Sequence, residues 1–202
     1  MKRIMGHMSP PKGPAGKIVI IGVGNLLLKD EGVGVHVVQE LRKKGLPSTV
    51  EVHDGGVAGI GLLDFFPGAS KVLLIDAADM NLTAGALVRF TPEEVAGRME
   101  GPRFSAHDIG LLEVLELARA LDQSPPQVVI FGIQPKEISW GTELSPEVQA
   151  SIPQVTDLIL KEINQVSEDF FATENSEVTE SKFEIGIPRN GGLNKYECPK
   201  FK

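Results

Sequence analysis

Three side chains suited to metal chemistry lie next to apolar segments of the chain: Glu31, Asp76 and His107. Glu31 stands in a glycine-rich loop after the β-branched run 18–21, Asp76 directly follows the apolar run 72–75, and His107 precedes a strongly apolar helical segment. Because the carboxyl ends of parallel strands meet at one edge of a sheet, we expect the three side chains to face one cleft. Two carboxylates and an imidazole with open positions suit a divalent transition metal such as nickel or zinc.

Each of these residues could also have a purely structural role. Glu31 and its neighbour Asp30 could favour the N-terminus of the next helix, because acids interact well with that end of the helix dipole. Asp76 could be a turn residue, and His107 could belong to the cap of the following helix. Taken singly, the residues leave both interpretations open, and only their common position at one sheet edge favours a site.

The first loop opens with a Gly-Val-Gly turn at residues 22–24, which resembles the start of a dinucleotide-binding fingerprint. That fingerprint needs glycine or alanine at position 27, where we expect a close strand–helix approach, and the chain has Leu27. Asp30 and Glu31 would also repel a pyrophosphate, whereas carboxylates in such a loop suit a cation. A nucleotide-binding module is therefore disfavoured.

Strand-like and helix-like periodicities alternate from residue 17 onward. This alternation predicts right-handed crossovers and an α/β fold, a three-layer α/β/α sandwich with a five-stranded, mostly parallel sheet. The link 77–85 is too short for a helical crossover, so one strand, 86–90, is expected to run antiparallel at or near an edge. The predicted strands are 17–23, 48–53, 71–76, 86–90 and 127–133, and the predicted helices are 33–44, 58–66, 92–98, 108–122 and 145–166.

Length and composition bound the organisation of the chain. The 202 residues fit a single α/β domain at 17–166, with a flexible leader at 1–16 and a tail at 167–202 that we expect to be disordered. The apolar runs are too short to cross a membrane, and the net charge of −7 argues against general nucleic-acid binding. The only cysteine, Cys198, excludes an internal disulfide, as is typical of the reducing cytoplasm.

Other polar residues fall near the same sheet edge. The sequence Asp-Gly-Gly at 54–56 requires at least a tight turn with positive φ. His53 is expected to be structural, and His36 is expected to face outward from the first helix into solvent. The candidate substrate-binding residues are Asn25, Asp54, Gly55 and Gly56.

Four motifs in this order resemble the nickel–iron hydrogenase maturation endopeptidases, over roughly residues 17–165. They are GVGNLLLKDEGVG at 22–34, DGGV at 54–57, LLIDAAD at 73–79 and SAHDIGLLEVL at 105–115. The second motif is usually DGGT in that family, so Val57 replaces a threonine and removes its hydroxyl.

The resemblance implies a function and a set of site residues. Family members remove the C-terminal peptide of the hydrogenase large-subunit precursor after nickel insertion. Their metal-binding and catalytic triad corresponds to Glu31, Asp76 and His107, which would recognise nickel already held by the substrate. A divalent ion such as nickel, zinc or cadmium could bind the same site.

Standard proteolytic motifs such as HExxH and GxSxG are absent from the sequence. A non-catalytic chaperone that binds a metal or a metalloprotein during maturation, on the same scaffold, is the alternative interpretation.

Overall fold

The computed structural model describes residues 16–96, 103–104 and 110–172. The main strands are β1 (Ile18–Val23), β2 (Val50–Gly56), β3 (Lys71–Asp79), β4 (Leu87–Phe90) and β6 (Gln127–Ile133). They form one sheet in the order β2-β1-β3-β6-β4, parallel except for β4, which runs antiparallel to β6 at the edge. The predicted fold class and the antiparallel edge strand are confirmed.

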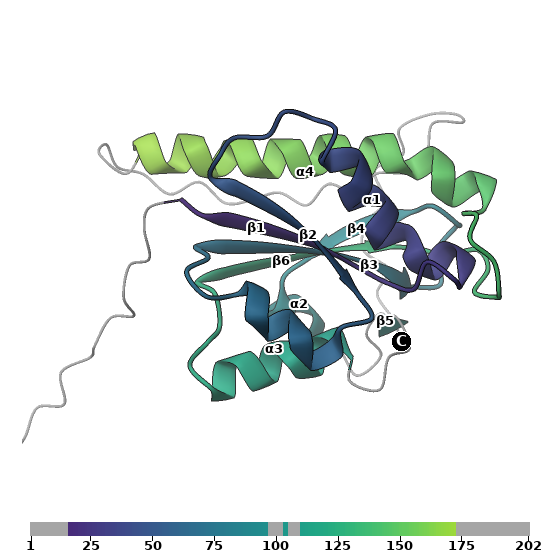
Figure 1. The fold of residues 1–202 in the computed structure, drawn as a ribbon, viewed down its shortest axis with the longest axis horizontal. Coiled ribbons are helices and arrows are strands. Elements are labelled where there is room, and N and C mark those ends of the chain that lie inside the picture. The colour runs from purple at the N-terminus through teal and green to yellow at the C-terminus, as the bar shows by residue number, and fades with distance from the viewer. Residues whose placement is uncertain (1–15, 97–102, 105–109, 173–202) are drawn as a thin grey trace, which may run out of the picture.

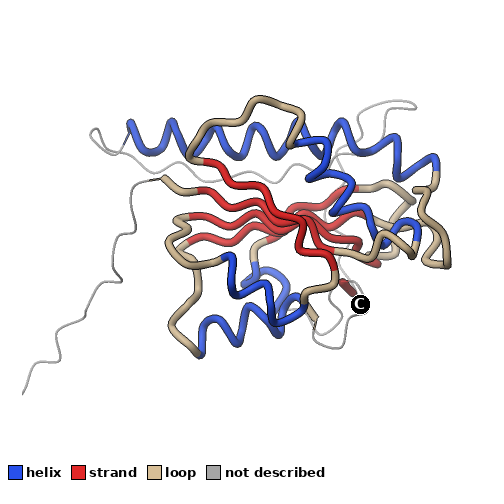
Figure 2. The backbone as a smooth tube through the Cα atoms, viewed as in Figure 1, coloured by secondary structure: helices blue, strands red, loops and turns tan. Residues whose placement is uncertain are grey.

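Helical segments cover both faces of the sheet. Figure 1 and Figure 2 show α1 and α4 over one face, and η2, α2 and α3 over the other. Within the described ranges, none of these helices is both long and apolar enough to span a lipid bilayer. The segments are η1 (Lys29–Gly32), α1 (Val33–Leu41), η2 (Gly59–Phe65), α2 (Pro92–Ala96), α3 (Leu111–Ala120) and α4 (Pro146–Ala172), of which η1 and η2 are 3-10 helices.

The alternation of side chains along β3 separates the two halves of the core. Leu73 and Ile75 belong to the apolar cluster that packs against α1 and α4. Val72 and Leu74 belong to the cluster that packs against η2 and α3. Because successive strand residues point to opposite faces, Asp76 shares the face of Leu74, the α3 side of the sheet.

Several element boundaries differ from the prediction. β2 and β3 extend beyond their predicted ends at 53 and 76, because ladder pairing continues between β1 and β2 and between β3 and β6. The predicted helix 58–66 is a 3-10 helix, in a segment where two glycines disfavour an α-helix. α4 continues past the predicted end at 166 to Ala172, and α1 ends early, at Leu41.

A two-residue strand, β5 (Arg103–Phe104), was not predicted. It pairs antiparallel with the end of β3 at Ala78 and Asp79. Two residues show no periodicity, so the sequence offered no signal for this strand. The predicted leader, except Gly16, and the tail beyond Ala172 lie outside the described residues.

The structure agrees with the predicted position of His53 but not with that of His36. His36 is only partly exposed, and its buried Nε2 atom has no hydrogen-bond partner in the described part of the chain. Burial lowers the pKa of His36, partly offset by the charge of Glu40, so the prediction of a solvent-facing side chain was wrong. His53 bonds Glu51 and packs on Phe65, the structural role that was expected.

A close strand–helix contact lies at Gly34, at the start of α1. A Cβ atom on Gly34 would lie 2.2 Å from the carbonyl oxygen of Ile75 and 2.4 Å from that of Val23. The helix can therefore begin directly against β1 and β3 only because this residue is glycine. Leu27, where the sequence argument placed the close approach, is instead 54% exposed in the loop, so that argument was wrong.

A buried ion cluster joins α4 to the sheet. The Glu162 carboxylate on α4 accepts hydrogen bonds from the Lys71 ammonium and, through both oxygens, from the Arg89 guanidinium. Burial by itself would raise the pKa of Glu162, but the bonds from Arg89 and Lys71 outweigh it, and the pKa lies below its usual value. The charged form of Glu162 therefore stabilises the fold.

Replacing this carboxylate should weaken the fold in a pH-dependent way. We expect Glu162→Gln to lower the free energy of unfolding by roughly 3 kcal/mol at pH 7, because Lys71 is left buried without its charge partner. Because the folded pKa is depressed, wild type has this stabilisation above about pH 4.5 and loses it as pH falls through the folded pKa. Urea denaturation should show that the difference in free energy of unfolding between wild type and Glu162→Gln is smaller at pH 4 than at pH 7.

Glu116→Gln serves as a matched control, because Glu116 is exposed on α3. It should change the free energy of unfolding by less than about 0.5 kcal/mol. Equal stability of wild type and Glu162→Gln at pH 7 would contradict a stabilising ion cluster.

Candidate active site

Glu31 lies in η1, where the chain returns over the end of β1. Its side chain is 2% exposed, and the buried Oε2 atom has no hydrogen-bond partner among the described residues. A buried acceptor left unsatisfied costs roughly 1–3 kcal/mol, and more if it carries charge. Such an oxygen is a natural position for a cation ligand.

Asp76 stands within β3, in register with Gly132 of β6. It is 0% exposed, and β3 continues beyond it to Asp79 instead of ending at residue 76. The sequence-based picture of Asp76 as the residue that ends the strand was therefore wrong. The η1 turn contacts β3, so the structure packs the turn that carries Glu31 against the strand that carries Asp76.

His107 lies outside the described residues, and its place in the triad stays a prediction. Described residues on either side of it are anchored to the fold. Phe104 pairs with Ala78 at the end of β3, and Leu111 begins α3 and packs in the same apolar cluster as Leu74. Within 16–96, 103–104 and 110–172, no group of three His, Cys, Asp or Glu side chains could hold a metal ion.

The glycine turn presses the first loop against Glu31. Gly24 has φ +133°, and a Cβ atom there would lie 1.9 Å from the carbonyl oxygen of Glu31. The Gly24 amide donates a 2.8 Å hydrogen bond to the carbonyl of Gly56 at the end of β2. The first and second motifs are therefore adjacent, as their place at one sheet edge predicted.

The candidate substrate-binding residues make local contacts. The Asn25 side-chain oxygen accepts a 2.9 Å bond from the Leu27 amide. The exposed Asp54 accepts a 2.9 Å bond from the Gly56 amide, and Gly56 has φ +46°, which confirms the predicted tight turn. Gly55 is buried, and a Cβ there would meet Ile21 at 2.7 Å. These contacts give Asn25 and the Asp-Gly-Gly sequence at 54–56 a structural role. Their part in substrate binding stays a prediction.

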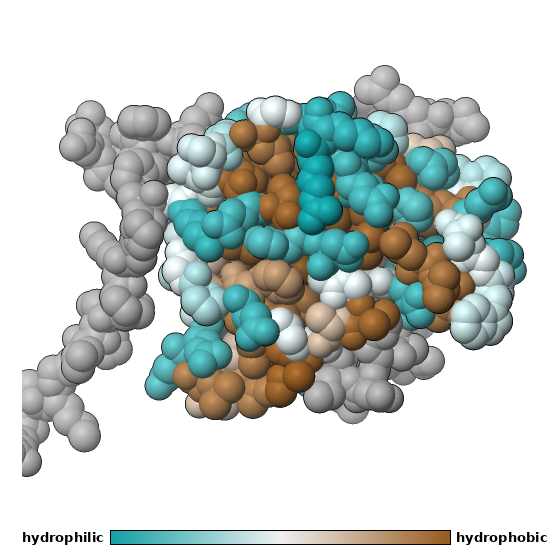
Figure 3. Space-filling view, in the orientation of Figure 1, coloured by the Kyte–Doolittle hydropathy of each residue, from teal (hydrophilic) through white to brown (hydrophobic). Residues whose placement is uncertain are grey.

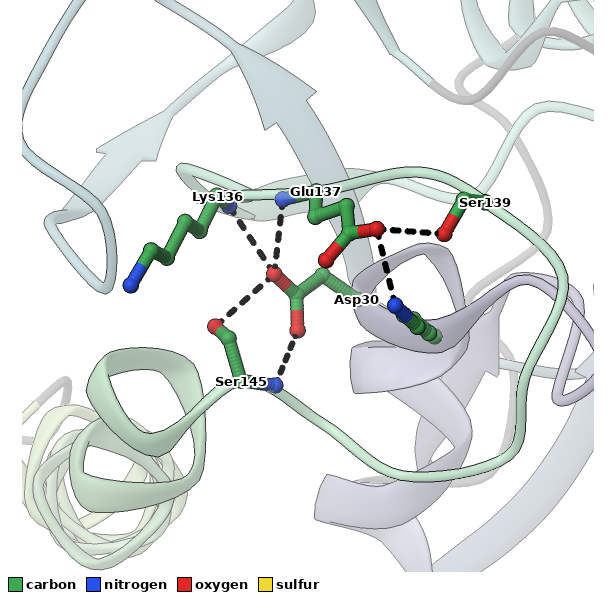
Figure 4. Close-up of polar contacts among 6 residues, drawn as sticks. Asp30, Lys136, Glu137, Ser139 and Ser145 are labelled. Atoms are coloured by element: carbon green, nitrogen blue, oxygen red, sulfur yellow. Dashed lines mark hydrogen bonds and ion pairs between the residues drawn. The ribbon is translucent and has the colours of Figure 1, made fainter.

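Asp30 has a role that the sequence did not reveal. It is 0% exposed, and its carboxylate accepts four hydrogen bonds from the segment 136–145 (Figure 4). No side chain of the described residues hydrogen-bonds the N-cap of α1, so neither Asp30 nor Glu31 caps that helix. The partners lie more than a hundred residues away, as the separations of 106 to 115 show, and no local pattern could indicate them.

Charged side chains of the segment 136–145 pair with η1 and with α4. The Lys29 ammonium bonds Glu137 at 2.8 Å, and this bond together with one from Ser139 lowers the pKa of Glu137. The Lys136 ammonium bonds Glu147 at 2.7 Å, which raises the pKa of Lys136. Both lysine ammonium groups thus bond exposed acids, and the four bonds to Asp30 come from uncharged donors.

Comparison with known sequences identifies relatives of one kind. A family model described as hydrogenase maturation protease matches residues 35–162. The hydrogenase expression/formation protein HupD of Bradyrhizobium diazoefficiens is 33% identical over 151 residues, which cover 74% of this chain and 79% of that protein. The Hydrogenase 2 maturation protease of Escherichia coli K12 is 29% identical over 150 residues, which cover 74% of this chain and 92% of that protein.

Solved structures give the same result. The hydrogenase maturating endopeptidase HybD from E. coli superposes with a TM-score of 0.63 at 29% identity, covering 74% of this chain and 93% of that chain. The [NiFe] hydrogenase maturation protease HybD from Thermococcus kodakarensis superposes with a TM-score of 0.62 at 30% identity, covering 73% and 99%. Fold and sequence therefore point to the same group of proteins.

The contact at Gly24 predicts a steric effect on the site. We expect Gly24→Ala to lower the free energy of unfolding by about 2–4 kcal/mol, because the methyl group overlaps the Glu31 carbonyl and the backbone conformation disfavours alanine. Gly45→Ala is the control, since a Cβ at Gly45 would have no atom of the described residues within 4 Å. Urea denaturation of both variants tests this. Equal free energies of unfolding of Gly24→Ala and Gly45→Ala would show that the loop adjusts to the methyl group without loss of stability.

Proposed function

The chain belongs to the hydrogenase maturation protease family and is a maturation endopeptidase, and from that membership we propose its substrate and metal. The substrate is the large-subunit precursor of a nickel–iron hydrogenase, from which the enzyme removes the C-terminal peptide after nickel insertion. Cleavage is nickel-dependent because the enzyme recognises nickel already bound to the precursor. The single cysteine fits a reducing cytoplasm as the compartment.

The observation that carries this proposal is the buried Oε2 atom of Glu31, which has no hydrogen-bond partner among the described residues. A cation that arrives with the substrate would supply the missing electrostatic partner. Asp76, on the strand against which η1 packs, is the second proposed ligand. His107 is the third, by its correspondence to the family motif. Oxygen and nitrogen ligands of this kind suit nickel or zinc.

In the proposed reaction, Glu31, Asp76 and His107 act on the metal-bearing end of the precursor. Binding of the nickel fixes the adjacent peptide bond at one position in the site, which lowers the entropic cost of reaching the reactive geometry. A bound divalent ion can polarise a carbonyl oxygen. The buried carboxylate of Asp76 would take a proton from the attacking water as the new C–O bond forms, and would return it to the leaving amine as the C–N bond breaks, as in an aspartyl-type endopeptidase.

Exposed apolar residues next to η1 fit a protein-sized substrate. Leu27, Ile138 and Trp140 are 54%, 52% and 80% exposed. Their loops are joined, because the Gly141 amide donates a 3.0 Å bond to the Leu27 carbonyl. Figure 3 shows apolar surface near the end of the molecule that holds η1, as well as over η2 and α3. Exposed apolar groups of this kind are typical of protein-binding surfaces.

Processing assays test the proposed substrate and the proposed ligands together. We expect wild type to release a short C-terminal peptide from nickel-loaded precursor and none from nickel-free precursor. Glu31→Gln and Asp76→Asn keep side-chain size and hydrogen-bonding capacity but remove the charge that favours a cation. Each should lower the cleavage rate by about 100-fold or more, with the folded state retained in a thermal melt.

Glu116→Gln is the matched control, because Glu116 is an exposed acid on α3, and this variant should cleave at the wild-type rate. Full cleavage by folded Asp76→Asn would remove Asp76 from the reaction. Binding of the nickel-loaded precursor without any cleavage by wild type would instead identify a maturation chaperone.

A metal soak tests the ligand set in the absence of precursor. We expect one cadmium, zinc or nickel ion within roughly 2.0–2.5 Å of Glu31 and Asp76 oxygens in a crystal of the enzyme. The site should be weak, because open positions are left for the substrate. An ion bound elsewhere, with both carboxylates outside coordination distance, would refute the assignment.

A further inference from the structure

We propose that Asp30 is a positioning residue of this endopeptidase, which holds the neighbouring Glu31 in place for the metal by tying η1 to the segment 136–145. This inference rests on the proposed function, in which Glu31 contacts the nickel of the precursor. It assigns a distinct task to each of two consecutive acids, one that contacts the substrate metal and one that does not.

The carboxylate of Asp30 is saturated with hydrogen bonds. Its Oδ2 atom accepts bonds from the amides of Lys136 and Glu137 at 2.9 and 3.0 Å and from the Ser145 hydroxyl at 2.9 Å. Its Oδ1 atom accepts a 2.6 Å bond from the Ser145 amide. Figure 4 shows the carboxylate enclosed between the two ends of this segment. One buried group thus fixes both ends of the loop after β6.

The backbone of η1 is bound to the same segment. The Lys29 amide donates a 2.9 Å bond to the Gly141 carbonyl, and the Asp30 amide donates a 3.4 Å bond to the Glu137 carbonyl. Consecutive residues of a 3-10 helix point about 120° apart, because the helix has three residues per turn. With Asp30 directed into the segment 136–145, Glu31 must point in a different direction, away from these donors.

Glu31 has no anchor of its own at its buried Oε2 atom, since that atom has no hydrogen-bond partner in the described ranges. Its direction is therefore set by the backbone of η1, and that backbone is held by Asp30 and its donors. Partners that orient a metal ligand typically change metal affinity by about 10–100-fold when they are removed. The same range is expected here.

Asp30→Asn is the direct test, because the new amide group would face N–H donors and break at least part of the cluster. We expect cadmium affinity, measured by titration calorimetry on the purified protein, to fall about 10-fold or more. With nickel-loaded precursor, kcat should fall at least about 10-fold while KM changes less than about threefold, because the substitution keeps the exposed apolar side chains that we propose contact the precursor. Ser145→Ala removes one donor and should show a smaller loss of both.

Glu162→Gln is the matched control for stability. It also removes a buried carboxylate, but one that joins α4 to Lys71 at the start of β3 and to Arg89 on β4. It should retain wild-type kcat and cadmium affinity under conditions where it is folded. Equal losses in Glu162→Gln and Asp30→Asn would mean that only stability is involved, and would overturn the positioning role.

The outcomes separate this inference from the proposed function. If wild type cleaves and binds cadmium, and folded Asp30→Asn does both as well as wild type, the positioning role is refuted and the function stands. If wild type does neither, the proposed function fails, and the inference fails with it. If Asp30→Asn does not fold, Ser145→Ala decides, and wild-type kcat and cadmium affinity in that variant would refute the inference.

Discussion

The return of the chain over the end of β1 is the constraint on which the site depends. Gly24 and Gly34 lie where a Cβ atom would overlap the backbone of Glu31 in one case and that of Val23 and Ile75 in the other. Because both residues are glycine, η1 and the start of α1 lie directly on the sheet. The carboxylate of Glu31 is thereby buried beside β3 instead of extending into solvent on a loop.

Burial has opposite consequences for the two acids of η1. Asp30 recovers the cost of leaving water through four hydrogen bonds from uncharged donors, whereas the Oε2 atom of Glu31 has no such partner among the described residues. An unsatisfied buried acceptor lowers stability, and the Glu162 ion cluster and the two apolar clusters of the core oppose that loss elsewhere in the fold. Strain of this kind concentrates at functional sites, where a ligand relieves it.

Much of the fold could be predicted because its signals are local. Runs such as Val72–Ile75 identify buried strands, and the short link before β4 implies its antiparallel direction. The features that were missed depend on contacts between distant segments. The bonds of Asp30 to Ser145, the exposure of Leu27, the partial burial of His36 and the pairing of β5 are set by tertiary packing, which leaves no periodic pattern in the sequence. For the site, motif order indicated Glu31 and Asp76, but neither the burial of Asp76 nor the bonding of Asp30 could be read from it.

Nickel X-ray absorption spectroscopy on the frozen complex of enzyme and nickel-loaded precursor tests most directly whether Glu31 meets the nickel. We expect the nickel in the complex to gain at least one oxygen ligand at roughly 2.0–2.2 Å relative to the free precursor, and to lose it again with Glu31→Gln. A nickel spectrum that is identical in the free precursor, in the wild-type complex and in the Glu31→Gln complex would contradict metal recognition by this buried carboxylate.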